Sequence, residues 1–161
     1  MITSIAILTS NAASGEGLHN VLTGLGSGRV RLVWDEPDFA LRSLTSVNVV
    51  ILLQDVPRER ARAVLRGLRR ISNRARSLLV VPFGEPADRV LEYLSLGARA
   101  ILHEHSSAAE LVDALPQVVD GNLYISPELV PALLDHYREL CAQVRRTSTS
   151  DCHLNEMQPF C

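Results

Sequence analysis

The stretch that decides the fold runs from Ala87 to Leu134 and reads ADRVLEYLSLGARAILHEHSSAAELVDALPQVVDGNLYISPELVPALL. It begins with apolar residues at helical spacing and stops at Gly97, a residue suited to the left-handed turn after a helix. The apolar run Ala98 to Leu102 then predicts a strand. Ser107 precedes a glutamate by three residues, the reciprocal capping pattern of a helix start, and this helix is expected to continue to Gly121.

This order of elements resembles the receiver domain of NarL/FixJ-type response regulators. The likeness rests on Gly97-Ala98 after a helix, a short apolar strand, the motif S-x-x-E-L, and then G-x-x-Y-I-S-P-E-L. It is close from Gly84 to about Leu134 and holds from Ile2 to Phe83 only by pattern. The resemblance implies a flavodoxin-like α/β fold, with a five-stranded parallel sheet in three layers (α/β/α) and an additional C-terminal helix.

Composition bounds the class of protein. The 161 residues are 47% hydrophobic and 21% charged, which fits one globular domain with its own core. A net charge of −2 argues against nucleic-acid binding through bulk charge, and all sixteen basic residues are arginine. The N-terminus lacks the positive segment of a signal peptide, and no apolar run reaches the roughly eighteen residues of a membrane span. We therefore expect a cytoplasmic protein without membrane contact, whose cysteines are reduced.

The remaining chain alternates between the two periodicities of strands and helices. Strands are predicted at 2–8, 29–34, 47–53 and 77–83, and helices at 19–25, at 35–44 and from Pro57 onward. This alternation implies parallel βαβ units with right-handed crossovers. Ser14 is interpreted as the cap of the first helix. The expected organisation is a receiver-like domain at 1–122, a linker or dimerisation helix at 123–146, and an unstructured polar tail at 147–161.

The resemblance also implies a set of chemical groups at the carboxyl ends of the strands. Acidic residues after the first strand hold Mg²⁺, and an Asp at the end of the third accepts phosphate. A Thr or Ser after the fourth strand and a Lys after the fifth bind the phosphoryl oxygens. Carboxylate oxygens suit a hard divalent cation, and a cation suits the developing negative charge.

This chain departs from that set at each position. The first strand ends in Thr9, Ser10 and Asn11 without a carboxylate, so the metal cradle is missing. Matching the third strand to the family places Leu53 at the phosphoacceptor, and leucine cannot be phosphorylated. Asp55 is a poor substitute, because it would lack metal ligands and lysine alike, and it is interpreted instead as a cap of the next helix. The other matched positions hold Pro82 for the hydroxyl residue, Glu104 for the lysine and Ile101 for the aromatic switch residue.

Two further readings concern the same strand ends. A small ligand or anion would find polar groups in a crevice at this edge, formed by Ser10, Asn11, Gln54, Asp55, Pro82 and Glu104. His103 and His105 flank Glu104, but two imidazoles and one carboxylate at a strand end are a weak metal site, and surface histidines are favoured. We expect no catalytic residues, no metal and no cofactor.

Two surfaces suggest partners. The third predicted helix carries an outward arginine stripe, which is either a solvated face or a docking surface for an acidic partner: Arg58, Arg62, Arg66 and Arg70. The last helix, expected to start with Ser126 as cap and Pro127 at its first position, carries a seam of two heptads. This seam consists of Val130, Leu133, Tyr137, Leu140 and Val144.

The sequence therefore predicts a degenerate receiver domain of a response-regulator-like transcriptional regulator. It would act without phosphorylation and without enzymatic activity, as a regulatory module that forms homodimers. A regulatory protein or a small-molecule effector is a further expected partner, and direct DNA binding by this chain is not expected. The alternative is a flavodoxin-like domain that binds a small ligand or anion in the strand-end crevice.

Overall fold

The computed structural model describes residues 3–26, 28–34, 44, 46–71 and 75–155. In these residues the strands form one parallel sheet in the order β2-β1-β3-β4-β5-β6. The strands are β1 (Ser4–Thr9), β2 (Arg29–Trp34), β3 (Val49–Leu52), β4 (Arg76–Val81), β5 (Ala100–His103) and β6 (Tyr124–Ile125). The helices are α1 (Ala12–Gly24), α2 (Arg58–Ile71), α3 (Ala87–Ser95), α4 (Ala108–Val119) and α5 (Val130–Asn155), with a 3-10 turn, η2 (Pro127–Leu129), before α5.

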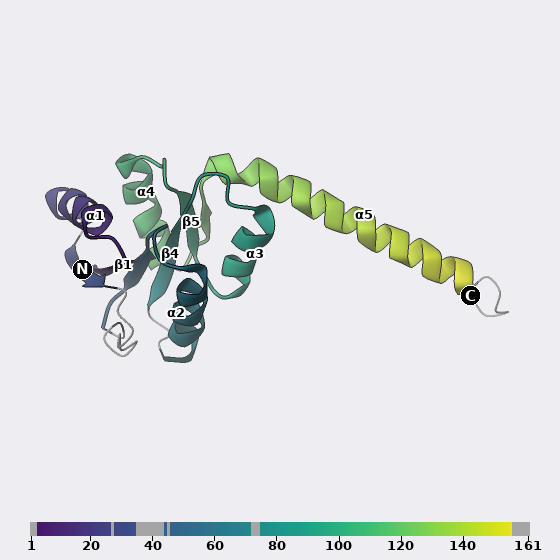
Figure 1. The fold of residues 1–161 in the computed structure, drawn as a ribbon, viewed down its shortest axis with the longest axis horizontal. Helices are drawn as coiled ribbons and strands as arrows, with labels where there is room; N and C mark the ends of the chain where they lie inside the picture. The colour runs from purple at the N-terminus through teal and green to yellow at the C-terminus, as the bar shows by residue number, and fades with distance from the viewer. Residues whose placement is uncertain (1–2, 27, 35–43, 45, 72–74, 156–161) are drawn as a thin grey trace.

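The helices cover both faces of the sheet, which confirms the predicted three-layer α/β/α arrangement (Figure 1). Leu22 of α1 and Leu111 of α4 pack against one face, together with Ile7 and Ile51 of the central strands. The opposite face packs against α2 and α3, whose buried residues include Ala61, Val64, Leu65, Val90 and Tyr93. Strands buried on both faces read as continuous apolar runs, which is why β1 and β3 were clear in the sequence.

Glycines end α3 and α4 as the sequence predicted. Gly97 has a φ of +105°, and its N–H donates to the carbonyl of Leu94 at 3.1 Å. The N–H of Ala98 donates to the carbonyl of Tyr93, also at 3.1 Å, which completes a Schellman motif. Gly121, with a φ of +83°, ends α4 through the same pair of bonds.

The prediction of five strands is corrected by β6. Tyr124 and Ile125 pair in parallel with Ala100 and Ile101 of β5 and extend the sheet to six strands. A strand of two residues is too short to show a period of two, and its pairing depends on α4 bringing the chain back beside β5.

The first helix also differs from its prediction. It begins at Ala12 rather than His19, and its cap is Asn11 rather than Ser14, since the Asn11 carboxamide oxygen accepts the N–H of Ala13 at 2.9 Å. The helix predicted at 35–44 lies outside the described residues except for Leu44, which is fully buried.

The last helix is longer than expected. It continues from Val130 to Asn155, so residues 147–155 of the predicted unstructured tail are helical. Ser126 precedes η2 rather than α5, and its side chain does not cap that turn. Figure 1 shows α5 leaving the body beside α3 and extending far beyond the sheet. None of the described helices is long and apolar enough to cross a membrane.

Two glycines give a matched test of these turns. Gly97→Ala places a side chain at positive φ and should destabilise the fold by about 1–2 kcal/mol. Gly24→Ala lies within α1 with nothing within 4 Å of the added Cβ, and should stabilise the fold by about 0.5–1 kcal/mol. Urea unfolding of both variants measures the difference, and a neutral Gly97→Ala would contradict the role of the left-handed turn.

Candidate functional site

The carboxyl ends of β1 and β3 lie side by side, and a hydroxyl joins them. Thr9, fully buried, donates from Oγ1 to Oδ2 of Asp55 at 2.6 Å. Thr9 Oγ1 also accepts the N–H of Asn11 at 3.1 Å, so this hydroxyl holds the chain at the start of α1 as well. The end of the first strand thus supplies a hydroxyl, not a carboxylate, toward the loop after β3.

Asp55 is held inward by this contact. Its Oδ2 is bound by Thr9, and its Oδ1 is buried without a hydrogen-bond partner among the described residues. The interpretation of Asp55 as a helix cap is not supported, because among the described residues its Oδ2 accepts the Thr9 hydroxyl and its Oδ1 has no partner. A carboxylate with one engaged and one buried oxygen is poorly placed to attack a phosphodonor.

Leu53, the residue that the resemblance matches to the phosphoacceptor, belongs to the apolar core. It is 6% exposed and packs in the cluster on the α1 and α4 face. Its N–H donates to the carbonyl of Leu8 at 3.1 Å, which extends the pairing of β3 with β1 by one residue. This backbone bond fixes the side chain toward the core.

Glu104 joins two loops at the same edge of the sheet. Its carboxylate Oε1 accepts the N–H of Phe83 at 2.8 Å, and its own N–H donates to the carbonyl of Val81 at 2.9 Å. Pro82 lies exposed between these two partners. At the position matched to the lysine, the chain therefore places a carboxylate that fastens the loop after β4.

The receiver fold implies Mg²⁺ at this edge, and the residues that the structure describes do not fit it. Mg²⁺ requires carboxylate oxygens in near-octahedral geometry. Among the described residues, Asp55 supplies the carboxylate that contacts Thr9, and its Oδ2 already accepts the Thr9 hydroxyl. Among the described residues no three His, Cys, Asp or Glu side chains cluster as metal ligands.

The predicted crevice is divided between two places. Gln54 and Glu104 line a cavity of about 320 Å³ between α1 and α4, whose apolar lining includes Leu18, Leu53 and Leu111. Asn11 and Asp55 meet around Thr9 instead and do not line that cavity, and neither do Ser10 and Pro82. The structure thus separates the polar groups that the sequence placed in one crevice.

His103 is buried, not a surface histidine as predicted. It is 6% exposed, and its Nδ1 accepts the N–H of His105 at 3.1 Å. Its Nε2 lies 3.4 Å from Oε2 of Glu128, in the turn before α5, without a hydrogen bond. The imidazole therefore connects the carboxyl end of β5 to the root of the last helix.

Ser126 stands between two carboxylates. Its hydroxyl lies 2.7 Å from Oε1 of Glu110 and 2.8 Å from Oε2 of Glu128, although it has one proton to donate. Glu110 also accepts the hydroxyl of Tyr124 at 3.2 Å, and burial raises the pKa of that tyrosine. Donation by Ser126 holds the pKa of Glu128 below its ordinary range, with a smaller contribution from His103.

The predicted capping box is half formed for this reason. The Ser107 side chain accepts the N–H of Glu110 at 3.1 Å, as expected. The carboxylate of Glu110 turns to Ser126 and Tyr124 rather than back to Ser107. A tertiary contact between α4 and β6 has displaced the local one.

The arginine stripe is partly neutralised by α3. Glu92 forms ion pairs with Arg58 and with Arg62, and the hydrogen bond from Arg58 lowers the pKa of Glu92. This bond likewise raises the pKa of Arg58. No local pattern on α2 predicts this pairing, because Glu92 is thirty-four residues away from Arg58. Arg66 and Arg70 remain exposed.

The predicted seam on α5 is mostly exposed. Leu133 packs against the core cluster of the α2 and α3 face. Val130, Tyr137, Leu140 and Val144 are 37%, 64%, 43% and 62% exposed. Beyond its first turns, α5 therefore presents apolar side chains that the domain itself does not cover.

Comparison with known proteins fits this geometry. No family model matches the chain. It is 28% identical over 121 residues to a glycerol metabolism activator of Pseudomonas putida, a match covering 71% of this chain and 53% of the activator. The chain spans about half the length of that curated relative.

Solved structures decide the fold. A LuxR-family two-component response regulator from Aurantimonas superposes with a TM-score of 0.71 at 19% identity, covering 85% of this chain and 99% of that one. The chain has the fold of a response-regulator receiver domain. The signal receiver domain of the NarL regulator of Mycobacterium tuberculosis superposes with a TM-score of 0.66 at 24% identity, covering 75% and 98%.

Sequence reasoning missed the groups that act across long separations. Thr9, Ser126 and Glu128 carry no local signal of their role, because their partners lie on other elements. Apart from its place in the family resemblance, the S-P-E motif was interpreted as a helix start. Ser126 is fully buried, and it directly follows β6, which pairs with β5. Recognising β6 in the sequence would have predicted this burial.

The hydrogen bond from Ser126 should have a measurable effect on the titration of Glu128. Ser126→Ala removes the main cause of the lowered pKa of Glu128, so this pKa should rise toward its ordinary value of 4.5 in a carboxyl NMR titration. Since the folded pKa is depressed, the stabilising contribution of Glu128 is complete above about 4.5 and is lost as pH falls through the folded value. Thr147→Ala, which removes a hydroxyl bound only to carbonyls of α5, is the control and should leave the titration unchanged.

Proposed function

We propose that this domain is a pseudo-receiver, the regulatory part of a transcriptional regulator that does not use aspartyl phosphorylation. The proposal rests on the end of β3, where Leu53 is buried in the core and the carboxylate of Asp55 accepts the Thr9 hydroxyl. The similarity to a metabolism activator and to regulators of the NarL and LuxR types supports the regulatory assignment. The domain itself acts through association rather than catalysis.

Phosphotransfer requires groups that the site replaces. Transfer to a carboxylate needs a metal to neutralise phosphate oxygens and a cation to stabilise the product. At the matched positions stand the hydroxyl of Thr9 and the carboxylate of Glu104. A negative group near the transferred phosphate raises the barrier instead of lowering it.

Incubation with Mg²⁺ and acetyl phosphate, or with beryllofluoride, should therefore leave the intact mass and the amide NMR spectrum unchanged. Asp55→Asn is the matched control, because it removes the one carboxylate at the end of β3 and should behave as the parent. Acid-labile phosphate on Asp55 at one equivalent would refute the proposal.

The output of the domain is proposed to be self-association through α5. The seam repeats at spacings of three and four, the pattern by which two helices interlock. It ends after Val144, since the next two seam positions are Thr147 and Asp151. A second copy of the same helix offers the matching pattern, whereas the domain body covers only Leu133.

Two heptads are a short interface. Isolated helices of this length are marginal in water, and about fifteen residues span roughly 22 Å. The helix here is not isolated, because Leu129 and Leu133 fasten its root to the core. Anchoring reduces the ordering cost of the dimer, since the helix is held at one end before it meets its partner.

Light scattering over a range of concentrations tests this assembly. The parent should show about twice the mass of one 17.7 kDa chain, and Leu140→Glu should return it to one. Ala142→Glu is the control, because it adds the same charge to the same helix at an exposed position off the seam. A parent that stays monomeric, or an equal effect of both variants, argues against the seam.

The cavity of about 320 Å³ between α1 and α4 favours a second candidate function, binding of a small ligand. Its size is at the lower end for small-molecule sites. Leu53 lines it, so the residue that removes the phosphoacceptor also supplies apolar surface. In this function an apolar effector would replace phosphate as the input to the same domain.

A further inference from the structure

The cavity between α1 and α4 extends down to the sheet. Val80 of β4 lines this cavity and is only partly buried, although β3 and β5 flank its strand on both sides. Leu78 lies two residues earlier, therefore on the same face of the strand, and is fully buried. In a parallel sheet, helices normally cover both faces of an inner strand. The space above Val80 is thus a hollow that the side chains of the domain leave open.

Gly17 keeps this hollow open on the side of α1. It lies within the helix and lines the cavity, and a Cβ added there would meet nothing within 4 Å. Glycine is a poor helix former, and packing does not require it at this position. Ala108, at the start of α4, is a second small residue in the lining. The chain therefore carries a glycine that weakens α1 at a position where a larger side chain would narrow the cavity.

The lining combines accessible apolar surface with a polar group that has no partner. Leu18 and Val21 of α1 line the cavity together with Val80, and each of the three keeps exposed surface. Gln54, in the turn after β3, is partly buried in the same lining, and no described residue hydrogen-bonds to its carboxamide. A carboxamide both donates and accepts hydrogen bonds, as a hydroxyl or an amide does.

We propose that this cavity binds a small uncharged molecule, with an apolar body and one hydroxyl or amide group that pairs with Gln54. The proposal rests on the second candidate function, ligand binding in the same cavity, and adds the class of the ligand. Among the described lining residues there is no arginine, whereas Glu104 supplies a carboxylate that repels an anion. A charged group of either sign would also exchange its hydration for a neutral partner, which is unfavourable.

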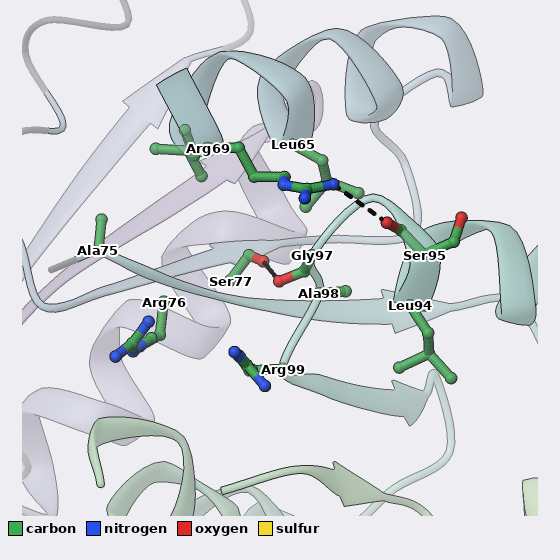
Figure 2. A pocket seen from close by; sticks show the side chains of 11 residues that line it. Leu65, Arg69, Ala75, Arg76, Ser77, Leu94, Ser95, Gly97, Ala98 and Arg99 are labelled. Atoms are coloured by element: carbon green, nitrogen blue, oxygen red, sulfur yellow. Dashed lines mark hydrogen bonds between the residues drawn. The ribbon is translucent and has the colours of Figure 1, made fainter. Parts of the chain in front are cut away.

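The cleft at the amino edge of the sheet lacks these features. Figure 2 shows Arg69 directed to the carbonyl of Ser95, to which its Nη1 donates at 3.3 Å. This cleft is larger, at about 500 Å³, but Leu65 and Leu68 in its lining are only 1% and 5% exposed. A ligand with an apolar body would find little accessible apolar surface there. The α1 and α4 cavity is therefore the better site for such a molecule, although it is the smaller one.

Amide NMR titration of the full chain with hexanol, hexanoate and hexylammonium tests the class of ligand, because the three probes share a body and differ in charge. Hexanol should cause saturable shifts at Gly17, Gln54 and Val80, with the millimolar affinity of a ligand this small. Hexanoate and hexylammonium should bind at least about tenfold more weakly, since neither finds a partner for its charge at Gln54.

Two glycines of α1 give a matched pair of variants. Gly17→Leu extends a side chain from the cavity wall and should lower the affinity for hexanol at least about tenfold, because it takes the space of the ligand. Gly24→Leu makes the same change on the same helix, also with nothing within 4 Å of the added Cβ, but does not line the cavity and should leave the affinity unchanged. Both variants replace a poor helix former and should remain folded, which circular dichroism checks.

Gln54→Met tests the polar contact, because methionine keeps the length of the side chain and removes its strong hydrogen bonds. The affinity for hexanol should fall by about threefold to tenfold, the usual range for one neutral hydrogen bond. This variant is independent of α1, so it also decides if Gly17→Leu does not fold. An unchanged affinity would overturn the role of Gln54.

The remaining outcomes separate the class of ligand from ligand binding itself. A charged probe that shifts the same amides with equal or higher affinity would overturn the uncharged class and leave the cavity as a binding site. The absence of saturable shifts with all three probes up to about 10 mM would overturn the class and the second candidate function together. Equal affinities of Gly17→Leu and Gly24→Leu would place hexanol outside the cavity.

Discussion

The parallel pairing of β1 with β3 is the constraint on which the arrangement of the carboxyl edge depends. It places Leu8 beside Leu52, and the bond from Leu53 to Leu8 extends it by one residue. Thr9 then reaches the loop after β3 and binds Asp55. Strand register thus determines where the side chain of Leu53 lies, because the same backbone bond that extends β3 directs it into the core.

Local signals were enough to predict most of the fold. Gly97 and Gly121 marked helix ends because a positive φ is a property of one residue and its neighbours. The start of α1 was harder to predict, because Asn11 and Ser14 are both good helix caps. The contact of Asn11 with Thr9 decides between them. The burial of His103 and the pairing of Glu92 depend on contacts between elements, which no local pattern records.

Acidic and basic side chains lie at opposite edges of the sheet. At the carboxyl edge, carboxylates of Asp55, Glu104 and Glu110 are occupied by hydroxyl or amide donors. At the amino edge, Arg69, Arg76 and Arg99 line a cleft that has no carboxylate among its described lining residues. In a chain without lysine, every cation is a planar group suited to paired hydrogen bonds, so the amino edge gains geometric selectivity together with charge.

Because α5 is long, a small change in its angle at the N-terminal end gives a large displacement of its C-terminal end. Its twenty-six residues make a rod of roughly 39 Å, held at one end by η2 and the Ser126 network. Tilting such a rod by about 10° moves the far end by roughly 7 Å, more than one helical turn. The hydrogen bond between Ser126 and Glu128 lies at the base of this helix, so a small rearrangement there would displace the far end of α5 the most.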